Sequence, residues 1–216
     1  MKIFSVRSVP STKWSSDKPL NFSPKPITIF ILCLGLFLFG LGESLIITAS
    51  VGMSPWTVLA EGLSITIGLS IGTLTFLISL GVLLLWIPLK QQAGIGTILN
   101  AIIVAAVIEW SLPYLPHPET YAMQILQAVL GTLIVGVASG IYLIANLGPG
   151  PRDGLMTGCQ KATGLPIAWV RVFLEIVVIT IGWTLGGTIG IATVIFAIGV
   201  GPAVSMGLYL IASISK

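Results

Sequence analysis

The sequence predicts an all-α membrane protein with six transmembrane helices in two inverted three-helix repeats, each with a short broken or re-entrant helix after its first span. Three observations predict it: an apolar composition, a repeat of 96 residues and the placement of the basic side chains. Of the 216 residues, 55% are apolar and 8% are charged, and the mean hydropathy is +1.05. Soluble domains carry about 25% charged residues, so the composition excludes a water-soluble globule.

The repeat appears when the sequence is compared with itself at a shift of 96 positions. Residues 40–104 then match residues 136–200 without a gap, with 17 identities in 65 positions. Apolar segments match one another easily, so the glycine and proline matches carry the most weight because these residues mark backbone breaks. They are Gly52/Gly148, Pro55/Pro151, Gly62/Gly158 and Gly68/Gly164.

Six apolar runs have the length and composition of membrane spans. In chain order they are Ile27–Ser50, Ile71–Leu89, Ile95–Leu112, Tyr121–Leu147, Ile167–Leu185 and Ile189–Ile214. Between the first and second run of each repeat lies a shorter segment, Pro55–Ile67 or Pro151–Thr163. A 13-residue helix reaches only ~20 Å, less than the ~30 Å hydrocarbon core. These segments are therefore predicted to be either re-entrant or interfacial.

The positions of the basic residues indicate whether the short segments span the membrane. If the short segments do not span, all ten Lys and Arg residues lie on or near one side of the membrane, and the second repeat is inverted. Five of them precede the first run, and the others are Lys90, Arg152, Lys161, Arg171 and Lys216. The opposite side receives Glu61, Glu109 and Glu119. The positive-inside rule then predicts that both termini are cytoplasmic.

The domain organisation follows from the runs. Residues 1–26 have no apolar periodicity and are predicted to form a disordered cytoplasmic tail. Residues 27–216 are predicted to form a single transmembrane domain, with one repeat over about 27–112 and the other over about 121–214.

Both repeats break at matching places, which points to a secondary-transporter site. The breaks read GMSPW and GPGPRDG, and their backbone candidates are Gly52, Pro55, Gly148, Gly150, Pro151 and Gly154. In the second break a new helix is expected to begin, and its free N–H groups beside Arg152 suit an anionic group. Asp153 is a further substrate or gating candidate. The alternative is a cytoplasmic turn that opens an interfacial amphipathic helix.

Carboxylates inside the predicted spans are the second functional signal, since a charge at membrane depth is costly unless it is paired or hydrated. Glu175 lies one helical turn after Arg171, so the two side chains share a helix face. This pair either gates a path or only neutralises itself. Glu43 has no basic residue near it in sequence and is the candidate for a proton-coupling carboxylate. The repeat places Ser139 opposite Glu43 in the alignment, and Ser79 opposite Glu175.

Aromatic residues near the ends of the runs are predicted to anchor the protein at the membrane interfaces. They are Trp56, Trp86, Trp110, Tyr114, Trp169 and Tyr209. Trp56 and Trp169 flank the two breaks and are also candidates for gating.

The residue inventory argues against an enzyme. His117 is the only histidine and lies in a predicted outer loop, so no histidine metal motif and no Ser-His pair exists within the membrane. Cys33 and Cys159 belong to different segments and form no metal spacing. No catalytic residue, cofactor, metal or nucleic-acid partner is predicted. The expected partners are the lipid bilayer, an unknown small solute, and either a second copy of the chain or a membrane-protein partner.

Several segments resemble the bacterial YczE/YitT-type family of multi-pass membrane proteins, and the YczE-like branch in particular. They are GMSPW, LLLWIPLK, GPGPRDGLM, VRVFLE and GWTLGGTIGIATVIFAIGVGP, within residues 40–202. The resemblance implies a protein of the bacterial inner membrane whose activity is unassigned, with transport as a common guess. Together these observations predict a small-molecule transporter or permease-like protein, proton-coupled and for an anionic solute. The alternative is an accessory or regulatory protein that acts on a membrane partner.

Overall fold

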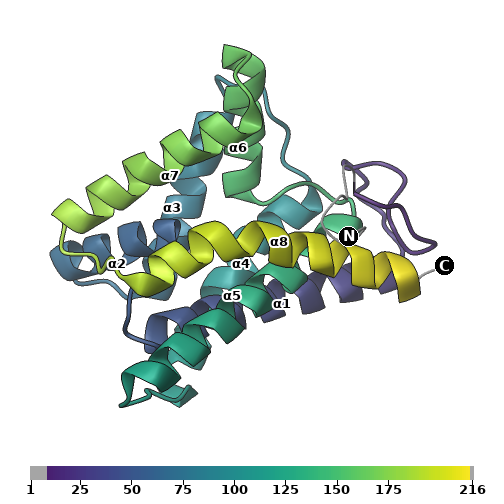
Figure 1. Ribbon diagram of the computed structural model, residues 1–216. Coiled ribbons are helices and arrows are strands. Elements are labelled where there is room, and N and C mark those ends of the chain that lie inside the picture. Colours follow the sequence, from purple (N-terminus) through teal and green to yellow (C-terminus); the bar gives the residue numbers. More distant parts are fainter. Residues whose placement is uncertain (1–8, 215–216) are drawn as a thin grey trace.

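The computed structural model describes residues 9–214, and this part of the chain is helical with no β-strand (Figure 1). The helices are α1 (Pro26–Thr48), α2 (Pro55–Ile67), α3 (Ile71–Trp86), α4 (Ile95–Ser111), the short 3₁₀ helix η1 (Leu112–Tyr114), α5 (Tyr121–Ile144), α6 (Pro151–Thr163), α7 (Ile167–Thr184) and α8 (Ile191–Ile214). The all-helical prediction is confirmed for these residues.

The helices pack as two groups of four. In the first group, α1 packs against α4 and α5, and α5 packs against α8. In the second group, α2 packs against α3 and α7, and α6 packs against the same two helices. Figure 1 shows α1, α5 and α8 running side by side, with α6 and α7 above them. Each group therefore takes two helices from each half of the chain, and contacts of α4 with α3 and α6 join the groups.

The two short helices have the bounds that the sequence predicts. Both begin with a proline at the first helical position, where the missing N–H costs no hydrogen bond. Both end at a glycine in the left-handed conformation, Gly68 with φ 81° and Gly164 with φ 70°. Proline at the start and glycine just past the end are the strongest helix boundary signals in a sequence.

The breaks that precede α2 and α6 have matching geometry. Gly52 and Gly148 have φ values of 107° and 105°, which side chains other than hydrogen rarely allow. The residue before each glycine accepts a hydrogen bond from the start of the last helix in the other half: Ala192 N–H donates to the Val51 carbonyl at 2.9 Å, and Gly96 N–H donates to the Leu147 carbonyl at 2.7 Å. Each break is thus fixed to the opposite half of the chain.

The membrane spans differ from the prediction at α3. Five helical segments are long and apolar enough to cross a membrane: α1, α4 with η1, α5, α7 and α8. A sixth span results if α2 and α3, bent by 113°, count as one. The predicted run to Leu147 extends three residues beyond the end of α5 at Ile144. The predicted run to Leu89 is also too long for the helix, because α3 ends at Trp86. Pro88 explains the end, since a proline has no N–H to donate to the carbonyl four residues earlier.

The described part of the predicted tail has defined contacts with the rest of the protein. Residues 9–25 contain no helix, yet they contact the first group. The Asn146 side-chain amide donates to the Ser16 carbonyl at 2.8 Å, and the Thr28 hydroxyl donates to the Trp14 carbonyl. Trp14 packs against the apolar core of α1, α4 and α5. These contacts are tertiary and leave no periodic signal in the sequence, and the rest of the tail lies outside the described residues.

Two of the predicted interfacial aromatic residues are buried. Trp86 is 3% exposed and Trp56 is 7% exposed, whereas the other four members of the set are exposed. The Trp86 indole N–H donates to the Pro151 carbonyl at 3.0 Å and so ties α3 to α6. Position near a helix end predicted an interfacial anchor, but the partner of Trp86 is the start of a short helix within the protein.

Candidate functional site

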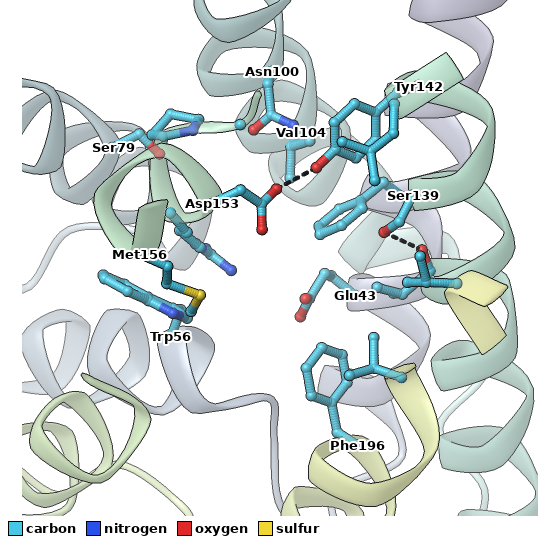
Figure 2. Close-up of a pocket in the computed structure, with 18 of the residues that line it drawn as sticks. Glu43, Trp56, Ser79, Asn100, Val104, Ser139, Tyr142, Asp153, Met156 and Phe196 are labelled. Carbon is cyan, nitrogen blue, oxygen red and sulfur yellow. Dashed lines mark hydrogen bonds between the residues drawn. The ribbon is translucent and has the colours of Figure 1, made fainter. Parts of the chain in front are cut away.

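A cavity of about 260 Å³ lies between the two helix groups. Helices α1, α4, α5 and α8 line one side of it, and helices α2, α3, α6 and α7 line the other. Figure 2 shows Glu43 and Ser139 on one side, facing Trp56, Met156 and Asp153 on the other. Every α-helix of the described chain contributes to this one cavity.

All five charged candidates from the sequence line the cavity: Glu43, Arg152, Asp153, Arg171 and Glu175. They come from α1, α6 and α7, and up to 132 positions separate them in the chain. Of the backbone candidates, Gly150 and Pro151 line the cavity as well. Gly52, Pro55, Gly148 and Gly154 do not line it, but they belong to the breaks and helix starts that hold the lining residues in place.

Glu43 is 1% exposed and belongs to the first helix group. Its Oε2 atom accepts hydrogen bonds from the Ser54 hydroxyl at 2.8 Å and from the Thr57 hydroxyl at 2.9 Å. Both hydroxyls lie at the start of α2, so the carboxylate fixes this helix start to α1. The Oε1 atom has no hydrogen-bond partner in the described chain.

Arg152 lies opposite, at the start of α6. Its guanidinium group stacks on the Trp56 ring, with 5.4 Å between the Cζ atom and the ring centroid. The charges of Glu43 and Asp153 act on it, but neither carboxylate forms an ion pair with it within 4.0 Å. A cation over an aromatic face keeps the N–H groups at the guanidinium edge available. Arg152 is therefore a positive group in the cavity without a paired anion among the described residues.

Tyr142 is a lining residue that the sequence interpretation missed. Its hydroxyl donates to Oδ2 of Asp153, and its ring meets Phe39 edge-on at 6.3 Å between centroids. The bond joins α5 of the first group to α6 of the second. Tyr142 lies near the end of an apolar run, where an interfacial tyrosine is equally expected, so the sequence carries no signal that distinguishes the two placements.

Arg171 and Glu175 form the ion pair that their spacing predicts, with 2.8 Å between Nε and Oε1. The Arg171 side chain is 39% exposed and that of Glu175 is 14% exposed. The pair lines the cavity from α7 and leaves only part of the guanidinium group free.

Three buried polar atoms lack a hydrogen-bond partner among the described residues: Glu43 Oε1, Trp56 Nε1 and Thr75 Oγ1. All three residues line the cavity. Buried polar groups in proteins are nearly always paired, and an unpaired one calls for an explanation. The unpaired polar atoms of the described residues are thus concentrated around this cavity.

Fourteen of the 22 lining residues form seven pairs whose members are separated by 96 positions. The pairs are Phe39/Val135, Glu43/Ser139, Trp56/Arg152, Thr75/Arg171, Ser79/Glu175, Asn100/Phe196 and Val104/Val200. Both copies of the repeat thus contribute these seven positions, and the other eight lining residues come from the second half of the chain. In five of the seven pairs the two side chains differ in polarity or charge, so the paired positions are asymmetric in chemistry.

The described residues contain no group of three or more His, Cys, Asp and Glu side chains that could hold a metal ion. The polar atoms of the cavity are mainly guanidinium, carboxylate and hydroxyl groups. Such a set suits a polar organic solute or an anion better than a transition metal.

The apolar helices and the charged cavity between them define a helical membrane protein with five or six candidate spans and a buried polar site. Residues 26–207 match a family model described as a family of unknown function, DUF6198, and the chain belongs to this family. It is 39% identical over 207 residues to an uncharacterized protein of Haemophilus influenzae, covering 96% of this chain and 94% of the relative.

Two relatives from Bacillus subtilis are more distant. The chain is 33% identical over 168 residues to the uncharacterized membrane protein YczE, covering 76% of this chain and 77% of the relative. It is 26% identical over 167 residues to the uncharacterized protein YyaS, covering 75% and 83%. The resemblance to the YczE-like branch is confirmed. No solved structure matches the chain.

Proposed function

We propose that the protein is a small permease-like transporter and that the cavity between the helix groups is its solute site. The observation that carries the proposal is the convergence of five charged side chains from α1, α6 and α7 on one cavity. Placing a charged side chain inside the membrane costs free energy, and such side chains typically mark substrate or ion pathways.

The pairing of helix contacts supports an arrangement in two inverted repeats. The shift of 96 residues relates α1 to α5, α2 to α6, α3 to α7 and α4 to α8. Under this exchange the contact of α1 with α4 becomes that of α5 with α8, and the contact of α2 with α7 becomes that of α6 with α3. An axis that exchanges the halves has this effect, and transporters with inverted repeats bind their solutes near such an axis.

In the proposed topology, α1, α3 and α4 cross the membrane in the first half, and α5, α7 and α8 cross it in the second. Helices α2 and α6 are re-entrant, both termini are cytoplasmic, and the membrane is the bacterial inner membrane. The Arg171–Glu175 pair then lies on the inner side of the cavity, where it serves as a gate. Alternating access follows if the second helix group moves against the first.

The start of α6 favours a solute with an anionic group. Its first N–H groups have no partner within the helix, and the positive end of the helix dipole lies there. Arg152 adds a full positive charge that no carboxylate pairs. Guanidinium groups bind carboxylates and phosphates strongly because their N–H groups match two oxygens at once.

Uptake into proteoliposomes tests the proposal. The purified full chain is reconstituted, and the accumulation of compounds from a pooled extract of bacterial metabolites is measured by mass spectrometry. We expect specific accumulation of at least one anionic or zwitterionic compound. Arg152→Gln should lower its uptake about tenfold or more, since a charge-assisted hydrogen bond contributes about 1.5–3 kcal/mol.

Lys161→Gln is the matched control, because it removes an exposed basic residue from the same helix and should leave uptake unchanged. Folding of each variant is checked by gel filtration and helical circular dichroism. Equal accumulation in protein-containing and protein-free liposomes would rule out transport. In that case the accessory role becomes the better account, and a partner that co-purifies after mild solubilisation is expected.

A further inference from the structure

We propose that the cavity accepts a small zwitterion, with its anionic group on Arg152 and its ammonium group on Glu43. The inference rests on the proposed function only in taking the cavity as the solute site. It replaces the coupling proton that the sequence suggests for Glu43 with a positive charge carried by the solute itself.

Glu43 is prepared to receive a cation. Two hydroxyl groups donate to its Oε2 atom, so this oxygen already has protein partners. The other oxygen, Oε1, is buried without a partner on the cavity side. An ammonium group has three N–H donors and a positive charge. It therefore gives Oε1 a hydrogen-bond donor and balances the negative charge of the carboxylate.

Arg152 is the remaining positive group. The other charged lining residues already have partners: Arg171 is paired with Glu175, and Asp153 accepts from the Tyr142 hydroxyl. Arg152 stacks on Trp56, and the charges of Glu43 and Asp153 act on it, but no carboxylate lies within 4.0 Å of its guanidinium group. One unpaired negative atom on the first helix group thus faces the cavity together with one unpaired positive group on the second.

The charge count favours a zwitterion over a simple anion. The lining contains two guanidinium and three carboxylate groups, with a formal charge of −1 when all are ionised. An added monoanion doubles this negative charge in a partly desolvated space, where charge repulsion is stronger than in water. A zwitterion leaves the total unchanged and places each of its charges beside an opposite one.

A matched series of compounds tests the inference. Glycine, β-alanine and 4-aminobutyrate are compared with the acids that lack the amine (acetate, propionate and butyrate) and with the amines that lack the acid (methylamine, ethylamine and propylamine). Equilibrium dialysis of radiolabelled compounds against the purified full chain near pH 7 gives the dissociation constants. At least one amino acid of the series should bind about tenfold or more tightly than its matched acid and its matched amine, or about 1.4 kcal/mol.

Two variants assign the charges. Glu43→Gln keeps the shape of the side chain and should reduce binding of that amino acid to the level of the matched acid. Arg152→Gln should reduce it to the level of the matched amine. Glu119→Gln and Lys161→Gln remove exposed charges away from the cavity and should change nothing. Gel filtration of each variant separates a lost contact from a lost fold.

Two results would overturn the inference. The first is an acid that binds as tightly as its amino acid and takes up one proton per molecule bound, with the proton uptake lost in Glu43→Gln. That result assigns the positive charge to a proton and leaves the transporter proposal intact. The second is the absence of binding for all nine compounds. Uptake from the metabolite pool then decides separately whether the protein transports another kind of solute.

Discussion

The contact between Gly154 and Trp86 sets how closely α6 approaches α3. A Cβ atom at Gly154 would lie 1.9 Å from the Trp86 ring, which leaves no room for a methyl group. The same indole ring donates to the Pro151 carbonyl at 3.0 Å. Arg152 and Asp153 lie between these two contact points in the chain. Because Gly154 has no side chain, the start of α6 can lie against Trp86. Arg152 and Asp153 are held at the cavity by this close approach.

Replacing Gly154 by Ala should destabilise the protein. The methyl group must displace a buried ring, and overpacking of this kind costs about 1–3 kcal/mol. A lower melting temperature in detergent, followed by tryptophan fluorescence, is the expected result. Gly81→Ala is the control, because a Cβ at this helical position in α3 meets nothing within 4 Å. The Gly81 variant should be neutral or slightly more stable, as alanine favours the helix by up to about 1 kcal/mol.

The residue scale also separates what the sequence can predict from what it cannot. Glu43 could be predicted because charges are rare in apolar runs and each one requires a reason. Arg152 could be predicted because it lies in a glycine- and proline-rich break where a new helix is expected to begin. Thr75 and Asn100 line the same cavity but could not be predicted. Threonine and asparagine occur in many helix contacts, and only the three-dimensional arrangement shows which of them face a cavity.

At the scale of elements, the breaks before α2 and α6 are held by backbone contacts. A Cβ at Gly52 would lie 2.5 Å from the Gly190 nitrogen, and a Cβ at Gly148 would lie 3.0 Å from the Gly94 nitrogen. At Gly52 the obstructing atoms all belong to the Gly190 backbone, whereas at Gly148 the nearest atom is the Thr97 hydroxyl oxygen at 2.7 Å, followed by the Gly94 backbone. Each break thus packs tightly against the opposite half, and the start of each short helix is fixed with it.

Alanine at Gly52 or at Gly148 should lower stability by similar amounts. Each variant combines a positive φ, which costs about 1–2 kcal/mol with a side chain, with a close contact to the opposite half of the chain. Gly68→Ala is the matched control: its φ is also positive at 81°, but a Cβ there has nothing within 4 Å. Thermal unfolding in detergent should rank the control variant above both others. An equal loss in all three variants would assign the effect to strain alone and not to the contact between halves.

Helix boundaries follow the strength of their local signals. The ends of α2 and α6 agree with the prediction because proline and glycine act on the residues beside them. The end of α3 does not, because hydropathy stays high through Leu89 while the helix stops at Trp86. Hydropathy reports transfer into lipid, whereas helix continuation depends on the backbone, so the two can disagree near Pro88.

At the scale of the whole molecule, the proposed topology can be tested by labelling. Cys33 and Cys159 are first replaced by Ala, and a single cysteine is then introduced by Glu119→Cys or by Lys161→Cys. Both positions are exposed. A membrane-impermeant maleimide added to intact cells should label the first variant only, and it should label the second in inside-out vesicles. Labelling of both variants from the same side would contradict the inverted arrangement of the halves.

The arrangement of the whole molecule was the hardest level to predict. Most helices are apolar on all faces, so hydrophobic periodicity does not show which face meets lipid and which meets the cavity. The repeat shows that the two halves correspond, but not that α1, α4, α5 and α8 form one group and the other four helices a second. That division depends on long-range packing, which no local pattern encodes.

The Trp56–Arg152 stacking contact joins two positions that are 96 residues apart. An assembly of two identical half-length chains would carry the same side chain at both places, either two indoles or two guanidinium groups, and neither arrangement forms a cation–π contact. The same holds for Glu43 and Ser139, where identical copies would bring a second carboxylate to the cavity. Covalent fusion of the halves therefore has a chemical benefit: it allows each copy to mutate independently, so that one supplies the indole and the carboxylate while the other supplies the guanidinium.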